Sequence, residues 1–511
     1  PVPDFKKVTL KNSDNFSIVG QSMPRADIPS KVDGSAMFGL DVRVPEMLYA
    51  VVARCPTFGG KPAKFDAAKV KAIPGVRHVL EIEAVGPGAH SAGGIAVVAD
   101  TTAIALQGRE ALEIDWDRGP AANESSETLR QQFQSLIETP GKVIAGSGDF
   151  DSTFAGASSK LAATYELPFL AHATMEPMNC TVDIRPDRAE VWAPTQAPDW
   201  VHDVVTGIAG VPPDKVVVHT VLMGGAFGRR YHADYAVEAA QVSKAVGKPI
   251  QLVWTREDDM QHDFYRPATC QRVQAALDAQ GQIVAWRHLI ASTSIREFWD
   301  APGRNRPEGQ ELGEAAQLPY ATPNFRLEYS PVTSAVPRAW WRSVADSMNG
   351  FVIESFVDEL AASVKMDPLA FRLRHIDPPR RVANVHSANE AALDTKRLKA
   401  VAQLAAAKSD WGKPMPPGRG RGIACYYSFD SYVTEVAEVT VAKDGKVKVD
   451  RVVCAVDCGR AVNPDGVAAQ MESAIVYSLS AALMGEITIA NGAVKQANWD
   501  DAPVLRMREM P

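Results

Sequence analysis

The chain has 511 residues, 46% of them hydrophobic and 23% charged, which predicts two or more globular domains able to bury a site. Its formal net charge of −7 and its scattered basic residues argue against nucleic acid as a partner. No stretch approaches the roughly 18 consecutive apolar residues that would span a bilayer as a helix.

The first segment in chain order is polar, contains Pro24 and Pro29, and predicts a connecting arm over residues 1–30. Residues 31–117 predict a small α/β unit with a short helix over 67–72. The strands expected in this unit cover 35–44, 48–54, 76–82, 94–99 and 111–116.

Residues 118–148 are rich in Gly, Ser, Asn and Glu, contain one weak helical segment and are typical of a linker. Strands and helices then alternate over 149–409. In this region 215–223 predicts a strand, 224–228 a tight glycine turn, and the following segment a helix that ends at Gly247. The apolar positions that define that helix are Tyr235, Ala239, Val242 and Val246.

A second long helix is expected over 347–364, where Val352, Phe356 and Leu360 repeat every four residues. A connector rich in Pro and Gly over 410–422 leads to a last region with strands over 423–511.

Six cysteines are spread along the chain, and none forms a CxxC pair. The closest two, Cys454 and Cys458, lie in an apolar run typical of a strand, so we interpret them as buried structural thiols. An iron–sulfur centre needs about four thiolates. Any such cluster is therefore expected on another subunit or another part of the protein.

The glycine turn at 224–228 is the first candidate for a site. Glycines let the backbone approach a bulky ligand, and N–H groups in such a turn can bind an anionic phosphate; the alternative is a simple tight connection. The spacing matches neither a GxGxxG dinucleotide fingerprint nor a phosphate-binding loop that ends in Lys and Ser or Thr.

Three further segments carry polar side chains in apolar surroundings. His172 and Glu176 form either a site pair or a satisfied core pair. Gln196, after a strand expected over 189–193, has an amide that can both donate and accept. Arg342 follows two tryptophans and precedes a helix, so it could stabilise developing oxyanion charge or stack on tryptophan.

Taken together and in this order, these segments resemble the molybdopterin-binding subunit of the xanthine dehydrogenase and aldehyde oxidase family, the molybdenum hydroxylases. The similarity is strongest to the isoquinoline 1-oxidoreductase and membrane-bound aldehyde dehydrogenase branch. The segments that carry it are 26–34, 54–61, 172–177, 224–230, 341–343 and 463–470.

The resemblance implies an α+β protein in which a small α/β "hammerhead" domain over 31–117 precedes a large multi-subdomain molybdopterin-binding α+β region, formed by 149–409 and 423–511. It implies catalytic roles for Gln196, beside the molybdenum oxo group, and for Arg342, which would stabilise the transition state. The residues expected to bind the cofactor are Gly224, Gly225, Ala226, Phe227, Gly228, Arg229 and Gln470. The family holds molybdenum through the pterin dithiolene, so no protein ligand to the metal is expected.

The implied reaction is hydroxylation of an aldehyde or N-heteroaromatic carbon with oxygen from water and a glutamate as general base. The implied cofactor is molybdopterin with molybdenum, in the cytosine dinucleotide form. Electrons would leave through [2Fe-2S] clusters on a small partner subunit, and then through a cytochrome c subunit. The expected location is the periplasm or the inner membrane surface, with the cytoplasm as the alternative.

Several departures from the family pattern qualify this resemblance. The Gly-x-Gly-Glu segment that carries the family's base, and an N-terminal Glu-Met-Gly-Gln-Gly segment, are not among the 511 residues, so we expect activity to need segments outside this sequence. Tyr231 stands where purine-oxidising relatives have a substrate-binding glutamate, which disfavours purines. The residues Glu472, Ser473 and Ala474 replace the glycines usual after Gln470.

Two alternatives to this enzyme remain open at the level of sequence. One is a noncatalytic scaffold or interaction subunit whose site is completed by another chain. The other, a nicotinamide-dependent dehydrogenase, is disfavoured by the glycine spacing.

Overall fold

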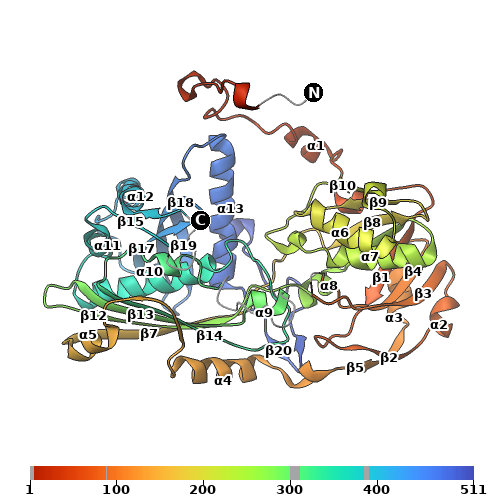
Figure 1. The fold of residues 1–511 in the computed structure, drawn as a ribbon, viewed down its shortest axis with the longest axis horizontal. Coiled ribbons are helices and arrows are strands. Elements are labelled where there is room, and N and C mark those ends of the chain that lie inside the picture. Colours follow the sequence, from red (N-terminus) through yellow and green to blue (C-terminus); the bar gives the residue numbers. More distant parts are fainter. Residues whose placement is uncertain (1–4, 88, 300–310, 385–390) are drawn as a thin grey trace.

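The computed structural model describes residues 5–87, 89–299, 311–384 and 391–511. These residues form two lobes, each built on a large sheet, with the long helix α13 (Pro464–Leu483) standing between them (Figure 1). The predicted mixture of helices and sheets is confirmed.

The first lobe is built on a seven-stranded sheet in the order β10-β9-β8-β11-β1-β4-β3. Its strands are β1 (Leu48–Ala53), β3 (Val76–Ile82), β4 (Gly94–Ala99), β8 (Asn179–Ile184), β9 (Ala189–Ala193), β10 (Val216–Thr220) and β11 (Ile250–Val253). Strand β1 pairs in parallel with β11, which joins chain segments far apart in the sequence. The sheet therefore combines strands from the region 31–117 with strands from the region 149–409.

Both faces of this sheet are covered. On one face Val51, Val97 and Ala99 pack against Ala105 of α3 (Thr102–Glu110). On the other face alternate residues of the same strands pack with Tyr235 of α7 (Asp234–Val246) and with α6 (Pro198–Ala209). Burial on both sides explains why β4 reads as an unbroken apolar run.

The second lobe is built on a five-stranded sheet in the order β6-β14-β13-β12-β7 and a three-stranded sheet in the order β17-β18-β19. The strands are β6 (Lys142–Ser147), β7 (Ser159–Leu167), β12 (Thr269–Leu277), β13 (Ile283–Ser292), β14 (Asn324–Pro331), β17 (Arg419–Ser428), β18 (Ser431–Val441) and β19 (Val447–Asp457). The helices α10 (Asp346–Ser363), α11 (Pro368–Ile376) and α12 (Thr395–Lys408) pack with them.

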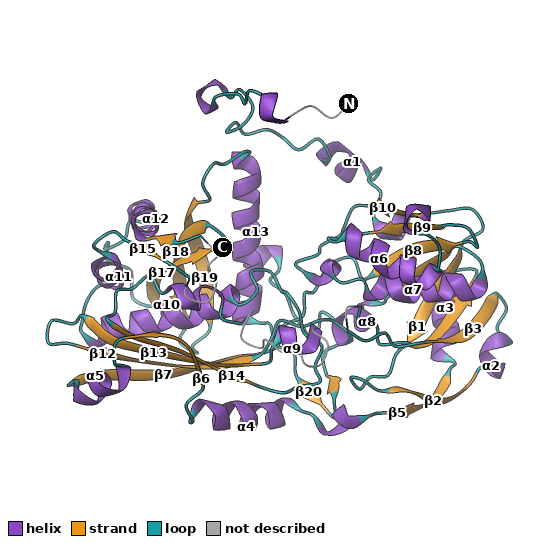
Figure 2. Cartoon of the chain, viewed as in Figure 1, coloured by secondary structure: helices purple, strands orange, loops and turns teal. Residues whose placement is uncertain are grey.

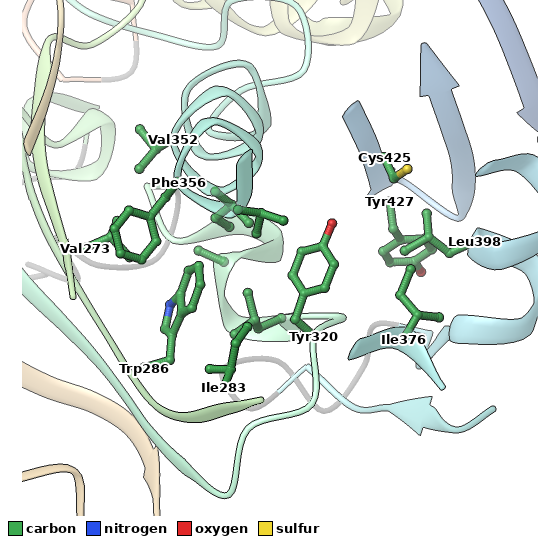
Figure 3. Close-up of a cluster of buried hydrophobic side chains, with 14 of the residues drawn as sticks. Val273, Ile283, Trp286, Tyr320, Val352, Phe356, Ile376, Leu398, Cys425 and Tyr427 are labelled. Carbon is green, nitrogen blue, oxygen red and sulfur yellow. The ribbon is translucent and has the colours of Figure 1, made fainter. Parts of the chain in front are cut away.

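The core of this lobe lies where α10 packs between the two sheets. Trp286 of β13 meets Phe356 of α10 edge to face, with ring centroids 5.2 Å apart, and Cys425 of β17 is fully buried on the opposite side of the same cluster (Figure 3). Val352, Phe356 and Leu360 are completely buried, which confirms the apolar face predicted for the helix over 347–364.

Helix α13 differs from the other long helices because none of its residues is buried. Figure 2 shows it rising beyond the second lobe, with the N-terminal segment passing near its upper end. Asn463, the N-cap of α13, donates from Nδ2 to the backbone oxygen of Met23, and Gly20 N donates to the backbone oxygen of Val462. These bonds fix the arm to the start of the helix.

Short elements complete the fold: α1 (Ile28–Asp33), α2 (Ala68–Lys71), α4 (Ser126–Ile137), α5 (Phe150–Gly156), α8 (Arg256–Gln261), α9 (Ile295–Trp299), β2 (Lys61–Asp66), β5 (Glu113–Asp117), β15 (Arg381–Val382), β16 (Leu393–Asp394), β20 (Ile489–Ala490) and β21 (Ala493–Val494). Within the described ranges, no helix combines the length and apolar character needed to cross a membrane.

The expected strands over 76–82 and 94–99 and the helix that ends at Gly247 are confirmed, but other predictions need correction. Cys454 is half-buried and Cys458 is exposed, so the interpretation of both as buried thiols was wrong. Residues 35–44 form no regular strand; they contain a 3-10 turn, Gly39–Asp41, and a single bridge from Phe38 to Leu222. The linker expected over 118–148 contains α4 and β6, and β6 is an edge strand of the second lobe. The connector over 410–422 is shorter than expected, because β17 already begins at Arg419.

Candidate functional site

The glycine turn over 224–228 connects β10 to α7 and adopts a backbone shape that few residues tolerate. Gly225, Phe227 and Gly228 have φ angles of +98°, +56° and +111°. A Cβ atom on Gly228 would lie 1.7 Å from the backbone oxygen of Trp340, so only glycine fits there. The turn therefore lies directly against the segment that carries Arg342.

Glu176 fixes the start of this turn. Its Oε2 accepts hydrogen bonds from Gly224 N at 2.8 Å and from Arg230 Nη2 at 3.1 Å. Its Oε1 accepts from Asn179 Nδ2 at 3.0 Å and Leu40 N at 3.2 Å. Of the two interpretations of Glu176, the structure supports a satisfied core carboxylate.

His172 is also a satisfied buried group. Its Nδ1 lies 2.9 Å from Asp263 Oδ1, and its Nε2 lies 3.2 Å from the backbone oxygen of Trp340. Burial acts to raise the pKa of Asp263, but the interactions with His172 and Arg229 outweigh it, and the pKa falls below its usual range. Asp263 is therefore an anion that organises the chain beneath the turn.

The side chain of Arg229 points into the protein. It is completely buried, donates to both carboxylate oxygens of Asp234 at 2.9 and 2.8 Å, and has its Nε 3.2 Å from Asp263. The structure therefore does not place this guanidinium among the groups exposed at the turn. Any contact of Arg229 with a cofactor would come from its backbone.

Gln196 is exposed and lies beside the turn. Its Oε1 accepts a hydrogen bond from Gly228 N at 3.2 Å, and its own backbone N donates to Arg230 O at 2.9 Å. Its Nε2 makes no hydrogen bond within the described part of the chain. The amide is thus oriented by the turn and keeps a donor for a ligand.

Arg342 is half-buried and contacts helix α13. Its Nη1 donates to Ser473 Oγ at 3.1 Å, and its Nη2 donates to the backbone oxygen and to Oε1 of Gln470 at 3.1 and 3.0 Å. Burial lowers the pKa of the guanidinium. Among the described residues no carboxylate contacts Arg342, so its positive charge faces only neutral groups.

A stack of three aromatic rings joins these parts, and sequence analysis did not identify its central member. The Tyr477 ring on α13 lies between Phe227, at 4.2 Å between centroids, and Trp341, at 4.6 Å. Its hydroxyl donates to the backbone oxygen of His172 at 2.9 Å. Nothing in sequence spacing could reveal this contact, because its members come from three distant segments.

An aromatic cluster adjoins the turn on its C-terminal side. Tyr231 is 43% exposed and meets Trp200 and Trp340 edge to face, at 5.4 and 5.7 Å between centroids. His232 is fully buried, stacks on Trp299 at 4.3 Å, and neither ring nitrogen has a hydrogen-bond partner in the described ranges. Burial lowers its pKa well below the usual value, so the ring is neutral.

These groups fit an anionic organic cofactor. The chain offers a strained glycine turn, an oriented amide at Gln196, and a cation at Arg342 that lacks an acidic partner in the described structure. Because no carboxylate in the described structure neutralises Arg342, its charge stays available for negative charge that develops on a ligand beside the turn.

Comparison with known proteins agrees with this geometry. Two family models, each described as a molybdopterin cofactor-binding domain, match residues 136–376 and 357–511. The chain belongs to the molybdenum hydroxylase large subunits.

Two curated proteins are similar to this chain along its whole length. The isoquinoline 1-oxidoreductase subunit beta of Brevundimonas diminuta is 32% identical, over 100% of this chain and 64% of the relative. The membrane-bound aldehyde dehydrogenase [pyrroloquinoline-quinone] of Gluconacetobacter polyoxogenes is 29% identical, over 99% of this chain and 68% of the relative. The chain thus spans about two thirds of the length of these relatives.

Solved structures show the same fold at low sequence identity. Quinoline 2-oxidoreductase from Pseudomonas putida 86 superimposes with a TM-score of 0.77 at 14% identity, covering 96% of this chain and 90% of that one. A CO dehydrogenase from Oligotropha carboxidovorans gives a TM-score of 0.74 at 16% identity, with coverages of 96% and 90%. The chain therefore shares the fold of these two proteins over almost its whole length.

Proposed function

We propose that this chain is the molybdenum-cofactor subunit of an oxidoreductase that hydroxylates an aldehyde or N-heteroaromatic carbon with oxygen from water. The observation that carries this proposal is the meeting of Gln196, the 224–228 turn and Arg342 with its neutral partners on α13. This arrangement supplies an oriented amide, backbone that can lie close to a ligand, and an unmatched cation.

Each of these residues would have a distinct role. Gln196 and the backbone of Phe227 and Gly228 would lie against the molybdenum end of the cofactor, and Gln470 would lie near its pterin. When bound, the molybdopterin would supply a Lewis-acidic oxidising centre. The guanidinium of Arg342 would stabilise negative charge that develops on the substrate oxygen or ring nitrogen in the transition state.

The general base is proposed to be a glutamate outside the 511 residues. Two buried carboxylates beside the turn support this view, because Glu176 accepts four hydrogen bonds and Asp263 is held by His172 and Arg229. Neither has an oxygen available to take a proton from a substrate.

The aromatic cluster supports the proposed substrate class. Tyr231, Trp200 and Trp340 present ring edges and faces beside Gly228, and no charged side chain belongs to this cluster. A flat apolar substrate would stack favourably there, whereas a purine would lack a carboxylate partner at Tyr231.

We further propose that the complex contains the cytosine dinucleotide form of molybdopterin and a small partner subunit with [2Fe-2S] clusters. A cytochrome c subunit would be the further electron acceptor, and the complex would be periplasmic or associated with the inner membrane. A second candidate, a scaffold whose site another chain completes, is favoured by one observation: α13 bears site residues yet buries none of its own.

The test is to purify the protein together with any co-encoded partner, measure bound molybdenum, and assay dye reduction with benzaldehyde and isoquinoline. Stoichiometric molybdenum with turnover supports the enzyme. An intact assembly free of molybdenum would refute it and favour the scaffold.

A further inference from the structure

Helix α13 presents one stripe of side chains to the candidate site. Gln470, Ser473 and Tyr477 are spaced by three and four residues, so they lie on the same face of the helix. Gln470 and Ser473 hold the guanidinium of Arg342, and Tyr477 lies one turn further along. A single helical face therefore contacts both the arginine and the glycine turn.

Tyr477 makes this connection through its ring. It is nearly parallel to Phe227, with an interplanar angle of 19°, and nearly parallel to Trp341, with an angle of 16°. Trp341 immediately precedes Arg342, and Phe227 immediately precedes Gly228. The ring therefore packs against both chain segments that carry predicted catalytic groups.

The position of Phe227 needs such support. Its φ angle of +56° lies in the left-handed region, which an aromatic residue adopts only when its surroundings enforce it. The hydrogen bond from the Tyr477 hydroxyl to the backbone oxygen of His172, at 2.9 Å, anchors the ring from the opposite side. The surrounding chain shields this hydroxyl from water and raises its pKa well above its usual value, so it remains a donor.

We propose that Tyr477 is a positioning residue for the hydroxylation, and that its ring sets the place of the Phe227–Gly228 backbone relative to the Arg342 guanidinium. This inference rests on the proposed function. Tyr477 touches no reacting group itself, and it acts through Phe227 and Trp341.

The experiment uses the purified complex with its partners and compares Tyr477→Leu, which removes the ring, with Tyr477→Phe, which keeps the ring and removes the hydroxyl. The control is Ser478→Ala, at an exposed position on the same helix. For each protein one measures kcat, KM, molybdenum and pterin content, and the electron paramagnetic resonance signal of the partly reduced metal.

Tyr477→Leu is expected to lower kcat by about 10- to 100-fold, with KM within about twofold, because small misplacements of catalytic groups have effects of this size. Its molybdenum and pterin contents should match the wild type, and its paramagnetic signal should change. Tyr477→Phe should restore kcat to within about threefold of the wild type, and Ser478→Ala should leave every quantity unchanged.

Three results would overturn the proposal: a wild-type kcat in Tyr477→Leu, an activity loss fully explained by lost molybdenum, or an equal loss in Tyr477→Phe. If Tyr477→Leu does not fold, Phe227→Leu removes the neighbouring ring instead and must show the same selective loss of kcat. Near-ultraviolet circular dichroism reports the Trp341–Tyr477 stack without any cofactor. The spectrum should change in Tyr477→Leu, and this test of the stack does not require molybdenum. A wild-type complex without molybdenum would refute the proposed function, and it would leave this test unaffected.

Discussion

At the scale of single residues, Arg342 is a cation whose hydrogen-bond partners are all neutral. Ser473 and Gln470 orient its guanidinium without neutralising it, and burial lowers its pKa. Such a group is available for charge that forms during a reaction, because no permanent carboxylate in the described structure competes for it.

The first prediction concerns this charge. Arg342→Met should lower kcat by about 100-fold or more while bound molybdenum stays at the wild-type level, because the lost interaction would exist mainly in the transition state. Steady-state kinetics with metal analysis checks this, and Arg188→Met, at an exposed surface arginine, is the matched control. A variant that fails to fold, or loses the metal, would indicate a structural role for Arg342.

Asp259 gives a prediction about pH. It is buried, pairs with Arg256 through Oδ2 at 2.6 Å, and has no hydrogen-bond partner for Oδ1 in the described structure. Burial raises its pKa from 3.8 to about 6. Between these values the native protein binds more protons than the unfolded chain, so the contribution of Asp259 to stability falls as pH rises, by at most about 1.4 kcal/mol per pH unit.

The measurement is the free energy of unfolding of wild type and Asp259→Asn in denaturant, at several values between about pH 4 and pH 6.5. The stability of the variant relative to wild type should improve as pH rises across this window. If the difference in the free energy of unfolding between the two proteins does not change with pH, Asp259 keeps an ordinary pKa in the folded protein.

At the scale of elements, the turn between β10 and α7 is the most constrained part of the site. Gly228→Ala should reduce the free energy of unfolding by about 3 kcal/mol or more, because a Cβ there meets the backbone oxygen of Trp340 and φ is +111°. Gly207→Ala in α6, where a Cβ meets nothing within 4 Å, should instead be neutral or stabilise by up to about 1 kcal/mol. Denaturant unfolding measures both variants. Equal changes in the free energy of unfolding would contradict the close approach of Gly228 to the backbone oxygen of Trp340.

Elements whose burial is reflected in local sequence could be predicted well. The unbroken apolar run of β4 and the four-residue repeat of Val352, Phe356 and Leu360 correspond to strands and helices in the structure. The expectation for 35–44 was wrong because a tertiary contact decides its shape: a Cβ on Gly39 would lie 2.7 Å from Pro194. The segment 118–148 looked like a linker because β6 is an edge strand with few buried residues.

The candidate site was predictable only in part, for a related reason. Gln196, Phe227 and Arg342 lie in segments with recognisable composition, and the structure brings each into contact with its neighbours in the site. Tyr477 and Asp263 act through contacts with chain segments far away in sequence. No local pattern distinguishes them from ordinary core residues.

At the scale of the whole molecule, the seven-stranded sheet links distant parts of the chain, and this leads to a prediction for the small domain expected over 31–117. Its strands β1 and β4 bury one face against α7, and β1 pairs with β11 of the later region. Expressed alone, residues 31–117 should therefore expose apolar surface, bind a hydrophobic dye and melt without a cooperative transition.

A fragment over 31–262 contains every strand of that sheet and α7, so it is the matched control and should show a cooperative melt. Circular dichroism with temperature compares the two fragments. Cooperative unfolding of 31–117 by itself would show that the small domain is independent of the rest of the sheet.

The pairing of β1 with β11 also has a consequence for synthesis in the cell. Leu48 pairs with Ile250, so about 200 residues must be made before β1 receives its neighbour, which takes about 10–40 s at usual rates of translation. During this time the apolar edge of β1 is open on the ribosome-bound chain and can pair with other strands. Yield should therefore depend on chaperones that act during translation, and a ribosome that stalls before residue 250 would release a chain prone to aggregate.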